Sequence, residues 1–553
     1  MLMKNIYIII LLYTITIQCQ TQYPKNFFSN PVGFKMAIAG TFGELRSNHF
    51  HSGIDVKTKQ TINLPIYAAQ DGYVSRIKVS SFGFGKAIYI THQNGYTTVY
   101  AHLENFNKKI QNITEKKQYE IESFEVDFSL QENEIKINNG EVIGYSGNTG
   151  SSTAPHLHFE IRDTKTQQVI NPMLFGLPIL DRTHPTITSI LIYHNNGRKE
   201  VIPTKQISEN KYILQNNPTI QSPFNIGINT YDLLDAAPNK NGIYAIDLYV
   251  NDTLFFSNKM TKFSFSETKY INTHIDYEYY KNSGLKFQKC FLDFNNNIST
   301  NIKNTTSHIG HNPNSHNYKI KIIVQDSYNN KTTLEFEAYI DSEKNTNTDN
   351  KSQDPLINCK QVFEFKNTDC EIYLPNNSLY KNHMFTYQKM NDTISQFPIY
   401  KIMDDSIPIH KNFILSIRAD SIDKDLREKA IIMRSENNKL FYIKSKWKDN
   451  KIIGKSNKLG YFTIALDTIN PTIKQVNENE LNTLQFKIKD ELSGIKEYRG
   501  EIDGKWILME YDFKTNILKH IFKKPPQKKH QKITLSVSDN VDNHETIEIE
   551  FYR

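Results

Sequence analysis

The sequence predicts a mainly β protein, in which an antiparallel β domain is followed by β-sandwich modules. Over residues 31–161, short β-branched and aromatic runs alternate with glycine turns. The rest of the chain is strand-patterned as well, and two pairs of distant segments in it resemble each other. The chain has 553 residues, 38% hydrophobic and 23% charged, which is the composition of a globular protein with several domains.

Residues 1–20 predict a secretory signal peptide. Lys4 precedes an apolar run over 6–17 that is too short to span a bilayer comfortably, and polar residues follow it. A short uncleaved anchor is the alternative, and the sequence does not decide whether Cys19 is lipidated. We therefore expect an exported protein, located in the periplasm, at the outer membrane or outside the cell.

The first predicted domain covers residues 21–180. Its clearest local signal is Asn94-Gly95 between the runs 87–92 and 96–102, a combination typical of a β-hairpin. A more polar, charged stretch over about 104–136 interrupts the strand pattern. We expect this insertion to pack as a helix or a lid near the functional site.

The remaining chain is predicted to form three β modules. DRTHPTI at 181–187 resembles DTINPTI at 467–473, and VQDSYNN at 324–330 resembles VSDNVDN at 537–543. These matching beginnings and ends predict two copies of one immunoglobulin-like (Ig-like) β-sandwich. The predicted boundaries are 181–342 and 467–553 for the Ig-like modules, 343–354 for a polar linker, and 355–466 for a further β-rich module. No pattern in the modules indicates catalysis, so we expect binding or spacing roles.

The charge and the cysteines limit the choice of partners. A net charge of +7 is mildly basic over this length and favours contact with an anionic envelope surface through the C-terminal modules. We expect no nucleic-acid partner. None of the four cysteines lies in a CxxC pair, so a cysteine zinc site is not predicted. Cys359 and Cys370 are close enough in sequence to bridge a hairpin, and two free thiols are the alternative.

Two histidine pairs carry the strongest chemical signal. One is in NHFHSGID at 48–55 and the other in PHLHFE at 155–160. Hydrolytic zinc sites usually have three His, Asp or Glu ligands and one open position for water. His51 and Asp55 could come from one segment that bends at Gly53, and the second pair offers two candidates for the third ligand. Each pair alone is ambiguous, because such pairs are more often structural.

The combined motifs closely resemble the M23 family of zinc metallopeptidases, the lysostaphin-like endopeptidases that cut cell-wall peptide. The resemblance covers about 47–175 and is carried by HSGID at 51–55, PIYAAQDGYVSRI at 65–77, TTVYAHL at 97–103 and GEVIGYSGNTGSSTAPHLHFEIRD at 140–163. It implies a lysostaphin-like β fold with one Zn²⁺ per chain. The implied metal ligands are His51, Asp55 and His158. The implied catalytic histidines, which orient water and stabilise the tetrahedral intermediate, are His102 and His156.

Three further residues are predicted to lie outside the metal site. His49 is expected to line the groove or to stand behind the ligands, His92 to be structural, and Glu160 to orient an imidazole. The resemblance implies a secreted zinc metalloendopeptidase that hydrolyses peptide cross-links of peptidoglycan through a metal-activated water. The alternatives are a non-catalytic M23-like regulator of other cell-wall hydrolases and a zinc endopeptidase with protein substrates. The sequence does not tell which bond is cut, or the oligomeric state.

Overall fold

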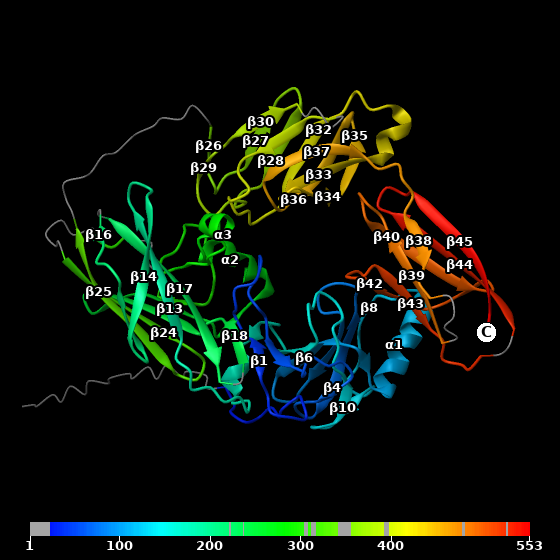
Figure 1. Ribbon diagram of the computed structural model, residues 1–553, viewed down its shortest axis with the longest axis horizontal. Helices are drawn as coiled ribbons and strands as arrows, with labels where there is room; N and C mark the ends of the chain where they lie inside the picture. Colours follow the sequence, from blue (N-terminus) through cyan, green and yellow to red (C-terminus); the bar gives the residue numbers. More distant parts are fainter. Residues whose placement is uncertain are drawn as a thin grey trace, which may run out of the picture.

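The computed structural model describes residues 23–220, 223–235, 237–303, 308–310, 317–340, 355–391, 397–477, 482–526 and 529–553. The signal peptide predicted over 1–20 and the linker predicted over 343–354 lie outside the described residues. Strands dominate and helices are few, so the predicted mainly β class is confirmed (Figure 1). Within the described ranges, no helix has the length and apolar character needed to cross a membrane.

The N-terminal domain, residues 23–180, is built on two antiparallel sheets that share one apolar core. The larger sheet contains, in spatial order, β1 (Ile38–Gly40), β2 (Ile54–Lys57), β11 (His156–Asp163), β6 (Tyr96–Leu103), β5 (Lys86–Thr91), β4 (Gly72–Val79) and β8 (Val126–Ser129), with β9 (Lys136–Ile137) and β12 (Val169–Ile170) at its side. The smaller sheet contains β3 (Pro65–Tyr67), β10 (Val142–Tyr145) and β7 (Asn105–Phe106).

The predicted insertion contains a helix, α1 (Lys108–Ile121), followed by strand β8. The helix begins at Asn107, whose side chain accepts a hydrogen bond from the backbone N–H of Ile110, and it ends at Glu122 in a left-handed conformation. It buries only a narrow stripe of side chains, namely Ile110, Thr114 and Gln118. The exposed face of this helix is therefore available to another part of the chain.

The second module, residues 181–340, is one continuous sheet whose two halves enclose a single core. Its strands are β13 (Thr186–His194), β14 (Lys199–Ser208), β15 (Lys211–Leu214), β16 (Thr219–Ile220), β17 (Phe224–Leu234), β18 (Ala237–Asn241), β19 (Ala245–Val250), β20 (Thr253–Lys259), β22 (Gln288–Lys289), β23 (Asn301–Lys303), β24 (Asn317–Gln325) and β25 (Lys331–Ile340). The segment 260–284 adds β21 (Lys262–Phe263) and the short helices α2 (Ile271–His274) and α3 (Tyr277–Ser283). Strand β21 pairs with β12 and so extends the large sheet of the N-terminal domain.

The third module, residues 355–466, consists of two main sheets over a common core. One contains β27 (Phe363–Lys366), β28 (Cys370–Leu374), β32 (Phe413–Arg418), β36 (Lys451–Ser456) and β35 (Ser445–Lys448). The other contains β30 (Tyr387–Met390), β31 (Ile399–Ile402), β37 (Gly460–Leu466), β33 (Ala430–Glu436) and β34 (Lys439–Ile443). Cys359 and Cys370 are buried free thiols here, so the structure has no bridge between them.

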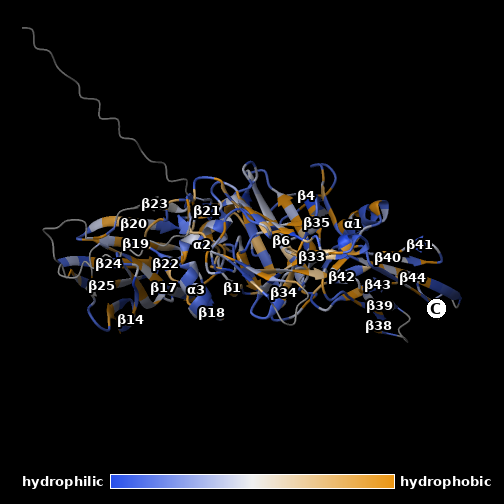
Figure 2. Ribbon diagram, turned by 90° about the horizontal axis from the view of Figure 1, so that it is seen from above, coloured by the Kyte–Doolittle hydropathy of each residue, from blue (hydrophilic) through white to orange (hydrophobic). Residues whose placement is uncertain are grey.

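The fourth module, residues 467–553, is a smaller pair of sheets over its own core. One sheet contains β38 (Thr472–Gln475), β39 (Thr483–Lys489), β43 (Ile517–Ile521) and β42 (Glu510–Asp512), and the other β41 (Lys505–Trp506), β40 (Ile495–Ile502), β44 (His530–Asp539) and β45 (His544–Tyr552). Along β45 residues alternate between exposed and half-buried, as expected for a strand with one face to solvent. The four bodies follow one another around a circuit in Figure 1 and form a flat assembly when seen from above in Figure 2.

The fourth module closes this circuit by docking on the N-terminal domain. Lys86 pairs with Glu510 at 3.0 Å, and the ring centroids of Phe82 and Phe513 lie 4.2 Å apart. The α1 helix takes part through the contact of Tyr119 with Trp506, whose ring centroids are 5.1 Å apart. Segments about 400 residues apart in sequence therefore form one interface.

Candidate metal centre

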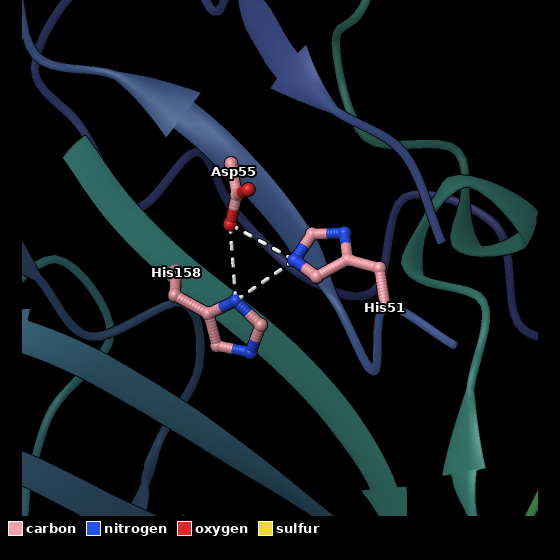
Figure 3. A group of neighbouring side chains, drawn as sticks. All are labelled: His51, Asp55 and His158. Carbon is pink, nitrogen blue, oxygen red and sulfur yellow. Dashed lines mark hydrogen bonds and ion pairs between the residues drawn. The ribbon is translucent and has the colours of Figure 1, made fainter. Parts of the chain in front are cut away.

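Three side chains predicted to bind metal converge on one point in the N-terminal domain (Figure 3). The Nε2 atom of His51 lies 3.0 Å from Oδ1 of Asp55 and 3.1 Å from Nδ1 of His158. Nδ1 of His158 lies 3.0 Å from the same carboxylate oxygen. Two imidazole nitrogens and one carboxylate oxygen therefore form a compact triangle, which we call the His–Asp–His centre.

Strand pairing brings this triangle together. Asp55 on β2 and His158 on β11 are directly opposite each other in an antiparallel pair, so their side chains project from the same face of the sheet. His51 approaches from the loop that leads into β2. A Cβ atom at Gly53 would lie 2.4 Å from the carbonyl oxygen of Phe159, so this loop can pass β11 only with glycine at that position. Gly53 thus permits a close backbone approach, in addition to the bend predicted from the sequence.

The outer nitrogens of both imidazoles have acceptors. Nδ1 of His51 donates to the carbonyl oxygen of Thr41 at 2.8 Å, and Nε2 of His158 donates to Oε1 of Glu160 at 3.0 Å. Glu160 is fully buried and also receives two hydrogen bonds from Arg162. These bonds set the tautomers, so that in the neutral form of each ring the nitrogen without a hydrogen faces the triangle.

The electrostatics of the centre follow from these contacts. Burial alone would lower the pKa of His158, but its hydrogen bonds to Asp55 and Glu160 raise that pKa to about 9. Burial alone would raise the pKa of Asp55, but the neighbouring His51 and hydrogen bonds from His156 and His158 hold it well below its usual range. The Asp55 carboxylate is therefore ionised and presents a negative charge to the two ring nitrogens.

Arg46 holds the outer oxygen of Asp55, a contact that the sequence did not predict. Its Nη2 atom lies 2.9 Å from Oδ2 of Asp55, and Glu44 pairs with the same guanidinium at 3.2 Å. Oδ1 of Asp55 is therefore the oxygen that faces the two histidines. Arg46 and Glu44 precede the histidine motif and lie in no recognisable pattern, so only the folded loop reveals them.

His102 reaches the centre because strand β6 carries a bulge. The pairing of β5 with β6 shifts register between Lys86 and Ile88, opposite His102, and the φ angle of His102 is +60°. A bulge with a left-handed residue turns the side chain away from the regular alternation of the strand. Nδ1 of His102 donates to the carbonyl oxygen of Thr149 at 2.9 Å, and burial lowers the pKa of this imidazole to about 3.

His156 lies on the same face of β11 as His158. Its Nδ1 atom is 2.8 Å from the carbonyl oxygen of Ala154, and its Nε2 atom is 3.3 Å from Oδ1 of Asp55. The ring centroid of His156 lies 4.9 Å from that of His102. The five residues predicted as ligands and catalytic histidines are thus brought together in one site.

The other two histidines singled out from the sequence lie outside it. His49 is exposed, and its Nδ1 atom contacts the carbonyl oxygen of Ser47 at 2.9 Å. His92 is buried between the carbonyl oxygen of Asp71 and the hydroxyl of Thr98, which are 2.8 Å from its two ring nitrogens. His92 therefore has a structural position, as predicted.

A cleft of about 520 Å³ opens beside the centre. Asp55 and His156 line it, together with Asn239 of the second module. Its basic lining residues are Arg46, Lys57 and Lys59. The cleft therefore has three cationic side chains next to the His–Asp–His centre.

A buried His–Asp–His triangle with two further histidines, set in an antiparallel β domain beside a cleft, defines a site of the metallohydrolase class. Residues 49–119 and 124–172 match peptidase family M23. The N-terminal domain is therefore a peptidase M23 domain, and the resemblance predicted from the sequence is confirmed for this part of the chain. Residues 354–467 match the Zu5-like domain family, a similarity that the sequence motifs had not suggested.

Named relatives are similar to about a quarter of the chain. The DD-carboxypeptidase/endopeptidase Mpg of Neisseria meningitidis serogroup B is 33% identical over 155 residues, which cover 28% of each chain. The peptidoglycan DD-endopeptidase ShyC of Vibrio cholerae is 28% identical over 142 residues, 25% of this chain and 27% of that protein. The matched part of the chain thus spans less than a third of the length of these relatives.

Solved structures with a similar domain include the catalytic domain of lysostaphin from Staphylococcus simulans. It is 24% identical, with a TM-score of 0.20, and the match covers 26% of this chain and 92% of that chain. A zinc-containing peptidase from Vibrio cholerae is also 24% identical, with a TM-score of 0.20 over 26% of this chain and 38% of that chain.

Proposed function

We propose that the protein is a zinc metalloendopeptidase that hydrolyses peptide cross-links of peptidoglycan outside the cytoplasm. The observation that carries the proposal is the convergence of one ring nitrogen of His51, one ring nitrogen of His158 and one carboxylate oxygen of Asp55. The three inner atoms lie about 3 Å from one another, so one cation can contact all of them at once.

The donor set fits zinc. Two imidazole nitrogens and one carboxylate oxygen are the ligand types of catalytic zinc sites, which keep a further position open for water or substrate. When bound, the metal would supply Lewis acidity and lower the pKa of a water molecule toward neutrality. His51, Asp55 and His158 would hold it, while Thr41, Arg46 and Glu160 fix the orientation of these three side chains.

The remaining histidines have complementary tasks. His102 is neutral at physiological pH because burial lowers its pKa, and its Nδ1–H is occupied by Thr149. Its Nε2 atom can therefore accept a proton from the attacking water. His156 has its Nδ1 atom on a backbone carbonyl and its Nε2 atom toward the centre, so in the protonated form Nε2 donates to the developing oxyanion.

The cleft favours an extended peptide with acidic groups. Lys57, Lys59 and Arg46 line it, so a carboxylate on a peptide bound there meets several cations. Stem peptides of peptidoglycan are short and carry free carboxylates, whereas a folded protein would not present such a segment readily. Two of the matching relatives have names that refer to DD-endopeptidases, which supports the same substrate class.

The test is digestion of defined cross-linked muropeptides and of an unfolded protein such as casein, with mass analysis of the products. We expect the zinc-loaded protein to cleave the muropeptide cross-link and to cleave casein at least tenfold more slowly, since casein lacks the D-configured cross-links. Preferential cleavage of casein would support a protein substrate instead. Zinc bound at one per chain without cleavage of either substrate would support the non-catalytic regulator.

A further inference from the structure

A second group of acidic side chains lies between the N-terminal domain and the second module. It consists of Asp181, which follows the peptidase domain, Asp232 on β17 and Asp326 after β24. One oxygen of each carboxylate lies within 4.8 Å of the others, and all three residues are buried. No salt bridge among the described residues reaches any of these carboxylates. We call this group the junction cluster.

Two oxygen atoms of the junction cluster, and one of the neighbouring Asn241, have no hydrogen-bond donor among the described residues. They are Oδ2 of Asp181, Oδ1 of Asp232 and Oδ1 of Asn241. Asn241 is 3% exposed and stands directly opposite Asp232 in the pairing of β17 with β18, so both side chains project from one face. Its amide nitrogen donates to the carbonyl oxygen of Asn239, which leaves the amide oxygen for another partner.

Buried acceptors without donors are unfavourable, typically by about 1–3 kcal/mol for each group and by more when the group is charged. Burial and the charges of Asp181 and Asp326 raise the pKa of Asp232 to about 9, which expresses the same repulsion. A cation would remove it. Ca²⁺ is the common ion whose ligands are carboxylate, amide and backbone oxygens, at about 2.3–2.6 Å. One oxygen of each of the three carboxylates lies within 4.8 Å of the others, so all three can reach a single ion at such distances.

The fourth module provides an internal comparison. Asp467, Asp490 and Asp539 form a related group. The turn after β44 has the same hydrogen bonds as the turn after β24. The side-chain amide of Asn330 donates to Asp326 and to the carbonyl oxygen of Asp181, and that of Asn543 donates to Asp539 and to the carbonyl oxygen of Asp467. The sequence repeats at 181 and 467 and at 324 and 537 are the origin of this correspondence.

The two groups differ at their third carboxylate. Asp490 accepts hydrogen bonds from the backbone N–H groups of Leu492 and Gly494, and Asp467 accepts one from Ser493. Oδ1 of Asp232 has no donor among the described residues, and Asp232 is 1% exposed. Among the described residues, every buried carboxylate oxygen of the fourth-module group has a donor, whereas Oδ2 of Asp181 and Oδ1 of Asp232 in the junction cluster have none.

We propose that the junction cluster is a calcium site, formed by the carboxylates of Asp181, Asp232 and Asp326 together with the amide oxygen of Asn241. The ion would join the segment that leaves the peptidase domain to two strands of the second module. Next to the cluster, Leu234 packs into the core of the peptidase domain, and Asn171 donates to Ser327 across the junction at 3.1 Å. Calcium would therefore fix the orientation of the second module, whose residue Asn239 borders the cleft.

The test is calorimetric titration of the full-length, zinc-loaded protein with calcium chloride near neutral pH, together with thermal unfolding. We expect one calcium ion per chain, with a Kd below about 1 mM as in extracellular modules, and a rise in Tm of several degrees at saturation. Asp232→Asn should weaken binding by at least tenfold and abolish the rise in Tm. The matched control is Asp490→Asn in the fourth module, which should bind calcium within about twofold of wild type.

Absence of binding and of any Tm change in the wild-type protein at about 10 mM calcium would overturn the proposal, and protons would then neutralise the cluster. Loss of binding in Asp490→Asn with retention in Asp232→Asn would also overturn it. If Asp232→Asn does not fold, Asp181→Asn takes its place, and the wild-type stoichiometry decides without any variant. These measurements do not use peptidase activity, so they are independent of the proposed function.

Discussion

Glu160 shows how a residue outside the His–Asp–His centre sets its geometry. It is completely buried, accepts a hydrogen bond from His158 and is paired with Arg162. Because it holds one nitrogen of the imidazole, it decides that the other nitrogen faces the metal position.

Replacing Glu160 with Gln should lower zinc affinity about 10–100-fold, measured by competition with a chelator. The buried Arg162 loses its counter-charge in this variant, so stability should also fall by about 3 kcal/mol. The double variant Glu160→Gln with Arg162→Met removes that charge as well. It should recover most of the stability but not the zinc affinity. Full zinc affinity in the single variant would show that Glu160 has no role in orienting His158.

Substitution of Gly53 tests whether the loop that carries His51 must pass close to β11. Gly53→Ala places a Cβ atom 2.4 Å from the carbonyl oxygen of Phe159, a contact that forces the two backbones apart. We expect a loss of at least about 2 kcal/mol in stability and a loss of bound zinc, measured by unfolding and elemental analysis. Ser47→Ala, on the exposed part of the same loop, should change neither. Normal zinc content in Gly53→Ala would contradict this account of the loop.

The sequence predicted the residues of the centre better than their supports. His51, Asp55 and His158 lie in motifs with characteristic spacing, whereas Arg46 contacts Asp55 only because the loop 41–50 folds back on β2. The bulge that presents His102 depends on the register between β5 and β6, which cannot be read from either strand alone. The positions of such residues depend on tertiary contacts, so no local sequence pattern predicts them.

At the level of elements, the second module supports the loop that carries His51. Phe42 and Phe50 of this loop share a small core with Met260, Phe263 and Ile271 of the second module. The backbone N–H of Phe50 also donates to the hydroxyl of Thr268 at 2.9 Å. The sequence predicted only binding or spacing roles for the modules. The structure shows in addition that one of them packs directly behind a residue of the centre.

Phe50→Ala should therefore affect the metal centre as well as stability. Removing a buried phenylalanine costs about 3–5 kcal/mol, and here the loss falls on the loop next to His51, so zinc affinity should drop at least tenfold. Phe256→Ala is the matched control, because Phe256 is equally buried but belongs to the inner core of the second module. Unfolding and chelator competition on both variants separate the two effects. Equal loss of zinc affinity in both variants would contradict a specific role of the loop core.

For the insertion over about 104–136, the sequence predicted the secondary structure but not the tertiary contact that it makes. A helix or lid was expected over about 104–136, and α1 (Lys108–Ile121) occupies this stretch. Its exposed Tyr119 contacts Trp506 of the fourth module. No feature of the helix sequence predicts this partner, because the contact joins surfaces far apart in the chain.

At the scale of the whole molecule, the fourth module docks close to the active site. Lys514 donates to the carbonyl oxygens of Asn148 and Ser152, in the loop that also carries Thr149, the partner of His102. The hydroxyl of Ser152 lies 3.1 Å from Nδ1 of His156. The second and the fourth module, which flank the peptidase domain in the circuit, thus both contact loops of the metal centre.

Opening this circuit should be measurable in solution. Glu510→Lys places a like charge against the buried Lys86, and Phe513→Ala removes the ring packed on Phe82. The double variant should show a larger radius of gyration in small-angle X-ray scattering, since the fourth module is then released from the peptidase domain. Lys496→Glu, whose partner Asp542 lies within the same module, should leave the radius unchanged. An unchanged radius in the double variant would show that the circuit is held by other contacts.

The central claim is that His51, Asp55 and His158 hold one zinc ion that makes the peptidase active. The most direct measurement is cleavage of a defined cross-linked muropeptide as zinc is added back to metal-free protein. We predict a linear rise of activity that ends at one zinc per chain, the same rise in His49→Ala, and no zinc-dependent activity in His51→Ala or His158→Ala. Full activity of the metal-free protein, or of the His158→Ala variant, would contradict the account.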